Sequence, residues 1–485
     1  MELLPPGATN PNVGECCLAL ASVLGNNKVL FPNTQPYNDS VNTYFAQQTA
    51  NLHPHCIISP TTAEDVSAAI STITATLETA NFAIRSGGHG TSLGASNIAN
   101  GITLDLRSLN SITVSPDRTT ASVGAGTTWG EVYAHLDPLG LSVAGGRAAQ
   151  VGIGGLTTGG GISYFSPRYG WTCDTVTNFE VVLADGTIVN ANEHENHELM
   201  TALRGGSNNF GVVTRVDLKA FEQGPMWGGT VYHSVDTYQQ QLEAFVEVNS
   251  AEGYDEHASL ITSFGFSAEG KAVLNNIVYT KAEDNPTVFR KFMEIPKLAS
   301  TVRIAGMHEL SVEQGSFSKN GKRQMMVVTT HGSTVPMLNA VYQYWDSSLA
   351  EVQDIPGIVW AISLEPLPPA IYARHASKNS LGLDNTSGAL VVTLLSATWD
   401  EEADDEKVER AARKLFDNID SDARELGVYE PFVYLNYAAQ WQDPIASYKG
   451  KSVDRLQRVS LNVDPKRVFQ VNVPGGFKLP ELNLN

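Results

Sequence analysis

Cysteine is scarce in this sequence, and no two cysteines are spaced as a metal-binding pair. None of the four lies in a Cys-x-x-Cys motif. They are Cys16, Cys17, Cys56 and Cys173. Structural zinc sites are built mostly from such pairs, so we expect no structural zinc. His194 and His197 lie three residues apart, but no further histidine or carboxylate completes a set of ligands, and we expect no metal at all.

Long hydrophobic runs are absent as well. Hydrophobic residues make up 42% of the 485 residues, which is enough for a large core and for two or three domains. The longest apolar runs, such as residues 389–395, fall far short of the roughly 20 residues that cross a bilayer. We therefore expect no transmembrane segment. The first eleven residues contain neither a basic region nor an apolar stretch, so we expect no signal peptide within this chain.

Positive charge is in deficit. Lysine and arginine number 32 against 51 aspartates and glutamates, which gives a formal net charge of −19. A surface this acidic repels the phosphates of nucleic acids and of anionic membranes. Neither nucleic acid nor a membrane is therefore an expected partner.

The cysteines also bear on the compartment. In an oxidising compartment Cys16 or Cys17 could pair with Cys56, whereas the cytoplasm would keep all of these thiols reduced. We expect a secreted protein with a disulfide, and the cytoplasm is the alternative.

Glycine, in contrast, is concentrated in one region. Residues 85–170 hold 18 of the 42 glycines. Glycine loses more backbone entropy on folding than other residues, so such a concentration indicates tight turns or a close approach of backbone to a ligand. Strand-like runs at 102–106, 120–123 and 176–183 alternate with these glycines, which predicts strands joined by ligand-facing turns.

Two local patterns flank this region. Before it, apolar residues at helical spacing predict a helix over 62–79, and residues 82–84 predict the strand that follows, so the region opens with a β-α-β unit. After it, residues 181–189 are typical of a hairpin with Asp185-Gly186 at its turn.

The middle of the chain has fewer glycines and a different pattern. Strand-like runs alternate with two helix-like runs, which predicts a second α+β domain. The strand-like runs are 273–279, 324–330, 358–364 and 389–395, and the helix-like runs are 237–249 and 404–421.

The segment Arg85-Ser86-Gly87-Gly88-His89-Gly90-Thr91-Ser92-Leu93-Gly94 carries the first chemical signal. Consecutive backbone N–H groups in a glycine-rich turn form a concavity that binds anions, and a diphosphate is its natural guest. The glycine-rich region contains no intact G-x-G-x-x-G, which argues against an ordinary Rossmann site. From chemistry alone, His89 could be a base, a ligand or simply a hydrogen-bonded polar residue.

This segment and several others, in the same order, resemble the berberine-bridge-enzyme-like oxidases of the vanillyl-alcohol-oxidase superfamily, which have a PCMH-type FAD-binding domain. The likeness covers most of the chain and is strongest to fungal FAD-linked oxidoreductases of secondary metabolism. The other segments that carry it are 56–60, 122–126, 151–161, 169–170, 203–211, 434–437 and 464–469.

The resemblance implies that FAD is bound covalently, through a bond from the imidazole of His89 to the 8α-methyl group of the isoalloxazine. It implies that the backbone around His89 wraps the diphosphate. The residues implied there are Arg85, Ser86, Gly87, Gly88, Gly90, Ser92 and Gly94. Those implied along the rest of the cofactor are Val151, Gly152, Gly155, Gly159, Gly160, Gly206 and Val213.

The sequence departs from the family at two positions. Many members have a second tether, a cysteine at the position of Ala148, so we expect a single covalent link here. Cys173 is not at that position, and we expect it to be a buried thiol. Leu156 stands where many relatives have a histidine beside the flavin. Val151, at the family's oxygen-gatekeeper position, is small and favours reaction with dioxygen.

Tyr434 and Tyr437 resemble the family's catalytic pair on a strand that faces the flavin. Residues three apart on a regular strand point to opposite faces, so a bulge or bend is needed if both are to line the site. A phenol titrates near 10, so a tyrosine base needs a nearby cation or hydrogen-bond donor. The sequence does not identify that partner.

Together these observations predict an α+β protein in three parts: an FAD-binding PCMH-type domain over 1–222, a substrate domain over 223–429 whose antiparallel sheet is backed by helices, and a segment over 430–485 that returns to the first domain. The expected reaction transfers a hydride from a small molecule, typically a natural product, to the flavin, which dioxygen reoxidises to give hydrogen peroxide. The alternatives are a redox-neutral isomerase or Diels-Alder-type cyclase, and a carbohydrate oxidase. The oligomeric state is left open.

Overall fold

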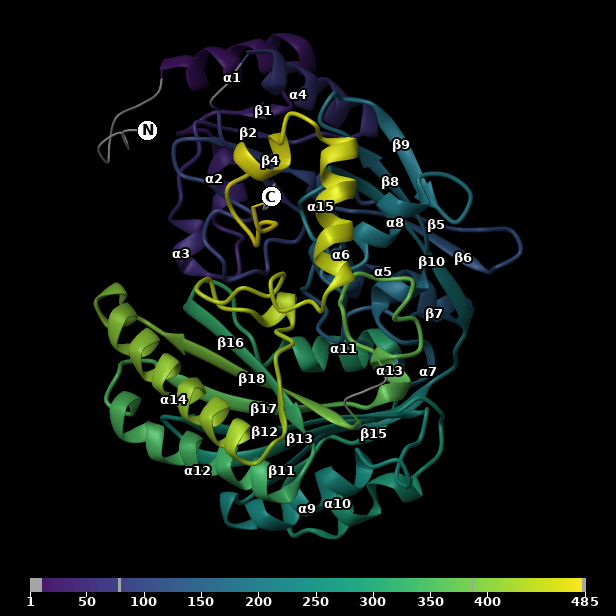
Figure 1. Ribbon diagram of the computed structural model, residues 1–485, viewed down its shortest axis with the longest axis vertical. Helices are drawn as coiled ribbons and strands as arrows, with labels where there is room; N and C mark the ends of the chain where they lie inside the picture. The colour runs from purple at the N-terminus through teal and green to yellow at the C-terminus, as the bar shows by residue number, and fades with distance from the viewer. Residues whose placement is uncertain (1–10, 77–79, 385–387, 482–485) are drawn as a thin grey trace.

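Three β-sheets organise the residues that the computed structural model describes, which are 11–76, 80–384 and 388–481 (Figure 1). Two sheets lie in one half of the molecule with the N-terminal helices and the C-terminal helix α15 (Lys451–Val463). The third, largest sheet forms the other half and has helices on its outer face. The predicted α+β class is confirmed.

The first sheet contains the β-α-β unit predicted at the start of the glycine-rich region. Strands β2, β4 and β3 are parallel, and β1 is antiparallel to β2. Helix α4 (Ala63–Thr76) joins β2 to β3, and residues 77–79, the end of the predicted helix, lie outside the described residues. In spatial order the strands are β1 (Val29–Leu30), β2 (Cys56–Ile58), β4 (Ile102–Asp105) and β3 (Phe82–Arg85).

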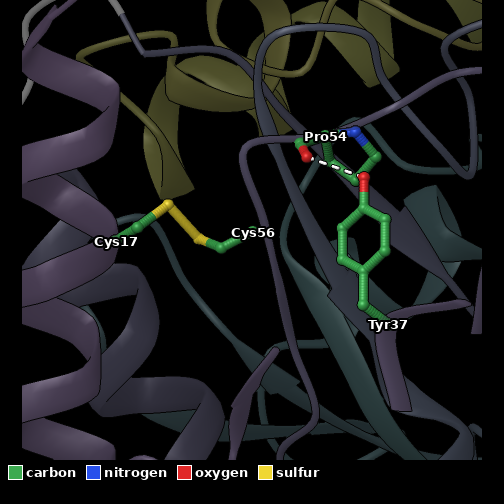
Figure 2. Close-up of a disulfide and its surroundings, with 4 residues drawn as sticks. All are labelled: Cys17, Tyr37, Pro54 and Cys56. Atoms are coloured by element: carbon green, nitrogen blue, oxygen red, sulfur yellow. Dashed lines mark hydrogen bonds between the residues drawn. A yellow bond between two sulfur atoms is a disulfide. The ribbon is translucent and has the colours of Figure 1, made fainter. Parts of the chain in front are cut away.

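A disulfide joins the N-terminal helix to this sheet. Cys17, on α1 (Pro11–Leu24), is bonded to Cys56 at the start of β2, so Cys17 and not Cys16 is the partner (Figure 2). Near it, Tyr37 donates a hydrogen bond of 2.9 Å to the carbonyl of Pro54. Cys16 and Cys173 are buried, as expected for Cys173.

We expect removal of this disulfide by Cys17→Ser to lower the free energy of unfolding substantially. The two cysteines are 39 residues apart, and closing a loop of that length is worth about 4 kcal/mol in the chain-entropy model. Urea denaturation followed by circular dichroism measures the change. Cys173→Ser, in which no cross-link is lost, is the control, and an equal loss in both variants would contradict the prediction.

The second sheet is antiparallel and completes the first half. As predicted, β8 and β9 form a hairpin, and Gly186 at its turn has a positive φ of 85°. In spatial order the strands are β5 (Ile112–Val114), β6 (Thr120–Gly124), β10 (Val212–Glu222), β8 (Val176–Val182) and β9 (Ile188–Asn192), and β7 (Leu141–Val143) also pairs with β10.

The third sheet has nine described strands, and every described pairing in it is antiparallel. Helices α9 (Tyr238–Val248), α12 (Val335–Val352) and α14 (Asp405–Glu425) cover one face, as predicted (Figure 1). In spatial order the strands are β14 (Lys297–Ser300), β11 (Met226–His233), β13 (Gly270–Tyr279), β12 (Ala258–Ser267), β17 (Val359–Leu367), β18 (Leu390–Trp399), β16 (Arg323–Gly332) and β19 (Tyr429–Glu430), and β15 (Arg303–Ala305) also pairs with β11.

The remaining described α-helices are mostly short. None of the described helices is both long enough and apolar enough to span a membrane. They are α2 (Gln35–Val41), α3 (Gln47–Ala50), α5 (Trp129–Leu136), α6 (Ile153–Thr158), α7 (Ser166–Tyr169), α8 (His197–Leu203), α10 (Arg290–Glu294), α11 (Met307–Gly315), α13 (Pro369–Tyr372) and α16 (Val468–Val471).

Side chains of the large sheet alternate between two hydrophobic cores. One set packs with α9, α12 and α14, and the other set, which includes Val328 and Val392, packs with the first half of the molecule. The C-terminal segment also belongs to the first half, because Phe82 at the start of β3 donates a backbone hydrogen bond of 2.7 Å to Asn472. These contacts bring residues from three distant parts of the sequence to one interface.

Candidate functional site

Arg85 supports the glycine-rich turn from behind. Its guanidinium is buried and donates to the carbonyl of Ser40 and to the hydroxyl of Thr43, both at 2.8 Å. It also lies 3.6 Å from the carboxylate of Asp105 and stacks over the ring of Tyr44. These contacts engage both terminal nitrogens of the Arg85 guanidinium within the protein, while its backbone begins the glycine-rich turn.

The turn after Arg85 is pressed against a second glycine loop. A Cβ added to Gly87 would lie 2.6 Å from the backbone nitrogen of Gly152, and one added to Gly152 would lie 2.3 Å from the nitrogen of Gly87. Ser86 joins the two loops, since its hydroxyl donates to the carbonyl of Ala125 at 2.6 Å and accepts from the N–H of Gly154 at 3.0 Å. Only glycines allow this approach. We call residues 85–94 and 152–155 the glycine cradle.

The cradle is open on one side. Gly90 and Gly155 are exposed, and no atom lies within 4 Å of a Cβ added to either of them. Gly88 and Gly94 have φ values of 71° and 81°, which side chains disfavour. Ser92 lies between them and is half-buried. A glycine turn of this kind exposes the backbone N–H groups that bind anions.

His89 projects from this turn with its ring free to react. The imidazole is half-buried and stacks on Phe45, with ring centroids 3.9 Å apart and planes inclined by 17°. Burial lowers the pKa of His89 to about 4, so the ring is neutral at physiological pH. Among the described residues none hydrogen-bonds to its ring nitrogens. A neutral imidazole with a free nitrogen is the nucleophilic form that attachment to a flavin requires.

The loop after α6 connects the cradle to the two tyrosines. A Cβ added to Gly159 would lie 2.1 Å from the side-chain oxygen of Asn436, and one added to Gly160 would lie 3.4 Å from both Leu381 and the ring of Tyr434. Gly159 and Gly160 thus lie beside the tyrosine pair, at the other end of α6 from Gly152.

Three of the expected cofactor residues have different surroundings. Val151 precedes Gly152 and is half-buried against the core, and its carbonyl accepts from the N–H of Trp129 at 3.0 Å. Gly206 packs against Phe210, and Val213 lies within β10 opposite Val181. No hydrogen bond within the described ranges joins Gly206 or Val213 to the cradle.

The expected strand at Tyr434 and Tyr437 is wrong, since residues Leu435–Tyr437 form a 3₁₀ turn. The N–H of Tyr437 donates to the carbonyl of Tyr434 at 3.0 Å. In a 3₁₀ turn residues three apart are eclipsed, so both rings lie on one side without a bulge. Their centroids are 4.8 Å apart and their planes nearly perpendicular.

The two tyrosine hydroxyls have different partners. That of Tyr434 accepts from the N–H of Gly161 and from the amide of Asn436, both at 3.0 Å. That of Tyr437 accepts from Arg147 at 2.7 Å and donates to Glu365 at 3.2 Å. Tyr437 is therefore the tyrosine in contact with charged groups.

Arg147 and Glu365 form a buried ion pair of 2.8 Å with side chains only 7% and 3% exposed. Burial by itself would lower the pKa of Arg147, but Glu365 and Tyr437 outweigh it and raise that pKa. Burial raises the pKa of Tyr437 well above 10, and Arg147 opposes the rise. Tyr437 is therefore protonated at rest, with a cation on one side and a carboxylate acceptor on the other.

Arg147 and Glu365 are the residues of this candidate site that sequence reasoning missed. Arg147 follows Gly145-Gly146 in the glycine-rich region, and Glu365 is the one charged residue of the run that forms β17. A single charge in a buried strand is a signal that could have identified Glu365, because a buried charge needs a partner. Arg147 and Glu365 are 218 residues apart, so nothing local could pair them.

His194 and His197 were the residues considered as metal ligands from the sequence. His197 lies 3.6 Å from Glu193, and both side chains are about half exposed. Within the described part of the chain, no three histidine, cysteine, aspartate or glutamate side chains gather as metal ligands.

The residues present fit a flavin dinucleotide. The cradle offers backbone donors to a diphosphate, and its close contacts are ones that only glycine permits. His89 offers a neutral nitrogen for a covalent bond. Tyr434 and Tyr437, which are linked to the cradle through the loop of Gly159 and Gly160, are the side chains that would act on a substrate of the bound flavin.

Comparisons with known proteins agree with this fit. A family model described as "FAD binding domain" matches residues 54–192. The chain is 37% identical over 485 residues to a Cercospora beticola protein named FAD-dependent monooxygenase CTB5, covering 96% of this chain and 92% of that protein. It is 41% identical over 471 residues to Oligopeptidase PhomG' of Diaporthe leptostromiformis, but covers 95% of this chain and only 37% of that longer protein.

Solved structures share the fold. The BBE-like 1 protein of Physcomitrella patens is 17% identical, with a TM-score of 0.78 over 95% of this chain and 99% of its own. Glucooligosaccharide oxidase from Acremonium strictum, whose structure is described by its 6-S-cysteinyl, 8α-N1-histidyl FAD, is 18% identical, with a TM-score of 0.76 over 96% of this chain and 100% of its own. At sequence identities this low, the comparisons show that the folds are alike and say nothing about a shared substrate.

Proposed function

This chain belongs to the family of FAD-dependent oxidoreductases represented by the Cercospora beticola protein, and it shares the fold of the berberine-bridge-enzyme-like proteins. From that premise we propose that it is an oxidase of a small organic molecule, typically a natural product. One observation carries the proposal. Tyr437, beside the loop that leads from the glycine cradle, has its hydroxyl between Arg147 and Glu365. FAD, when bound, supplies the two-electron acceptor and the route to dioxygen, which yields hydrogen peroxide.

The three-part division of the chain gives this site its position. We propose the boundaries 1–222, 223–429 and 430–485, and each part contributes one residue, Arg147, Glu365 and Tyr437 respectively. Sites at domain interfaces are common for cofactors and small ligands. The hydrogen bonds among the three residues also fix how the parts are placed at the site.

Tyr437 is the proposed proton acceptor. As a substrate proton reaches its hydroxyl oxygen, the proton that it already carries can pass to Glu365, 3.2 Å away. Arg147 donates hydrogen bonds to the Tyr437 hydroxyl and to the Glu365 carboxylate, which holds both groups in place. Its positive charge also stabilises negative charge that develops on the Tyr437 oxygen. Tyr434 has a supporting role, because its hydroxyl is bound by Gly161 and Asn436 and its ring packs edge to face with that of Tyr437.

A single covalent tether through His89 is part of the proposal. The FAD of the Acremonium strictum oxidase is both histidyl- and cysteinyl-bonded. Here the resemblance places Ala148 at the cysteine position, and Cys173 is buried by its neighbours in the core. His89 is the one group at the cradle with a free nucleophilic nitrogen.

Phe45 is expected to assist this attachment. Its ring holds the imidazole in plane by stacking, which is worth about 0.5–1.5 kcal/mol, so Phe45→Ala should slow attachment about 2- to 10-fold. The fraction of FAD that stays with acid-precipitated protein, sampled over time after adding FAD to apoprotein, measures the rate. Phe45→Tyr, which keeps the ring, is the control. Equal rates in Phe45→Ala and the wild type would contradict the prediction.

Monooxygenation is the second candidate, because relatives such as the Cercospora beticola protein are named FAD-dependent monooxygenases. Oxidase and monooxygenase differ in the fate of dioxygen. An oxidase releases both oxygen atoms as hydrogen peroxide, whereas a monooxygenase places one in the product.

A screen of natural-product phenols and alcohols, with sugars as a separate set, tests the proposal. Anaerobic addition of a substrate should bleach the flavin absorbance, and air should restore it with one peroxide per turnover. Incorporation of ¹⁸O from ¹⁸O₂ into product would instead indicate a monooxygenase. Product formation without bleaching would show the redox-neutral isomerase or cyclase, and turnover of sugars alone would show a carbohydrate oxidase.

We also propose that the protein is secreted. The Cys17–Cys56 disulfide supports this, since disulfides persist in oxidising compartments. Mass spectrometry of the culture medium and of cell extract from the producing organism tests it.

A further inference from the structure

One face of the large sheet is almost without charge. Successive side chains of a strand point to opposite faces. Val328, Leu367 and Val392 pack with the first half of the molecule, so they identify the face that lies toward the cofactor domain. In β12, β13, β16, β17 and β18, all of whose residues are described, Glu365 is the one charged residue at the positions of that face.

The charge of Glu365 is already matched. Its carboxylate pairs with Arg147 at 2.8 Å and accepts from Tyr437, and all of this is shielded from water. Glu430 on β19 lies opposite Thr330 on this face and pairs with Lys449 at 3.2 Å. At the face positions of the five strands named above, an ammonium group would find no further carboxylate, and a carboxylate would find no cation. A charge brought there would lose its water without compensation, which is strongly unfavourable.

Near Glu365 on this face, two serine hydroxyls form a hydrogen-bonded pair that is flanked by leucine side chains. Ser363 lies two residues before Glu365 on the same face, and its hydroxyl oxygen is 2.7 Å from that of Ser263 on β12. Leu394 is opposite Ser363 and Leu274 is opposite Ser263 in the strand register. Both serines are half-buried, which leaves their remaining hydrogen-bonding capacity accessible.

We propose that this face binds an uncharged substrate, which presents an apolar ring or chain to Leu274 and Leu394 and a hydroxyl or carbonyl group to the Ser263–Ser363 pair. The inference rests on the proposed function, which places the substrate between this sheet and the cofactor. It favours phenols, alcohols and ketones over amines and carboxylic acids.

Three probes with one ring system and different charges test the proposal: 2-naphthol, 2-naphthylmethylammonium and 2-naphthoate. Calorimetric titration of the FAD-loaded protein at neutral pH, where 2-naphthol is uncharged, measures binding without turnover. We expect the Kd of 2-naphthol to be at least about 10-fold lower than that of either ion. Equal or tighter binding of an ion, or no binding of any probe, would overturn the proposal.

Two matched substitutions locate the binding face. Ser363→Asp places a carboxylate beside the Ser263 hydroxyl, and the ammonium probe should then have the lowest Kd of the three. Ser267→Asp places the same charge on the same face at the far end of β12, and 2-naphthol should still have the lowest Kd. Ser363→Ala should raise the Kd of 2-naphthol about 2- to 10-fold through one lost hydrogen bond. Identical behaviour of Ser363→Asp and Ser267→Asp would overturn the assignment.

The two proposals fail separately. If no compound bleaches the flavin but 2-naphthol still binds best, the oxidase proposal fails and the binding face stands. If oxidation occurs but a charged probe binds best, the reverse holds.

Discussion

Replacing Tyr437 by phenylalanine is expected to lower kcat by about 10²- to 10⁴-fold, the usual contribution of a positioned acid or base. The substitution removes only the hydroxyl that accepts from Arg147 and donates to Glu365. The ring and its edge-to-face contact with Tyr434 remain, so FAD content and fold should not change. Stopped-flow measurement of anaerobic flavin bleaching, with the substrate found in the screen, isolates the affected step.

Tyr434→Phe is the matched control. Its hydroxyl accepts hydrogen bonds from Gly161 and Asn436 and contacts no charged group. We expect kcat to fall by about 10-fold or less. Loss of the hydroxyl removes hydrogen bonds that position the turn, and a typical hydrogen bond contributes only about 1 kcal/mol. A larger loss in Tyr434→Phe than in Tyr437→Phe would exchange the roles of the two tyrosines. Unchanged kcat in both would refute the proposed proton acceptor.

Replacing Arg147 by methionine is expected to lower both stability and activity. It would leave the Glu365 carboxylate buried without its cation, and breaking a buried pair in this way typically destabilises a protein by about 3–5 kcal/mol. It also removes the donor that stabilises charge on Tyr437, so kcat should fall as well. Urea denaturation of the FAD-loaded protein measures the free energy of unfolding.

The double variant Arg147→Met with Glu365→Leu separates the two effects. Replacing both charges by apolar groups of similar size should recover most of the stability, because no unpaired charge remains. It should not recover activity, because Tyr437 would have neither its cation nor its proton acceptor. Lys414→Met, which breaks an ion pair with Glu351 on the surface, is the control and should cost about 1 kcal/mol or less. If Arg147→Met cost no more than Lys414→Met, the buried pair would not have the proposed role.

Local patterns were sufficient to predict much of the fold. The hairpin at Asp185-Gly186 and the helix in 63–76 depend on neighbours in sequence, and both are present. The mixture of strands and helices in the middle of the chain was predicted from alternating strand-like and helix-like runs, whereas the antiparallel pairing was expected only once the resemblance had been recognised. The glycines of residues 85–94 indicated a turn with close approaches, and Gly87 does lie against Gly152.

The site could be predicted only in part, because its chemistry depends on contacts between distant residues. The strand expected at Tyr434 and Tyr437 is wrong because these residues follow a 3₁₀ turn, whose geometry is set by packing around Asn436 and Gly159. The cation that a tyrosine base needs was expected but not identified. Arg147 meets Tyr437 across 290 residues of sequence, a pairing that no local pattern contains.

Arg85 also shows that the position of a residue in a motif does not predict the contacts of its side chain. Its place in a glycine-rich motif suggested a role at the diphosphate, but not that its guanidinium lies beside Asp105 and over the ring of Tyr44. Motif position indicated where the residue lies. Only the tertiary contacts determine which of its groups remains available to a ligand.

Denaturing mass spectrometry of the purified, FAD-loaded protein tests the central claim, that a flavin is attached at His89. The predicted result is a peptide containing His89 that carries the mass of one flavin, with every other histidine and Cys173 unmodified, and with no such peptide in His89→Ala. An unmodified His89 peptide in the wild type, with all FAD released into the acid supernatant, would contradict the account.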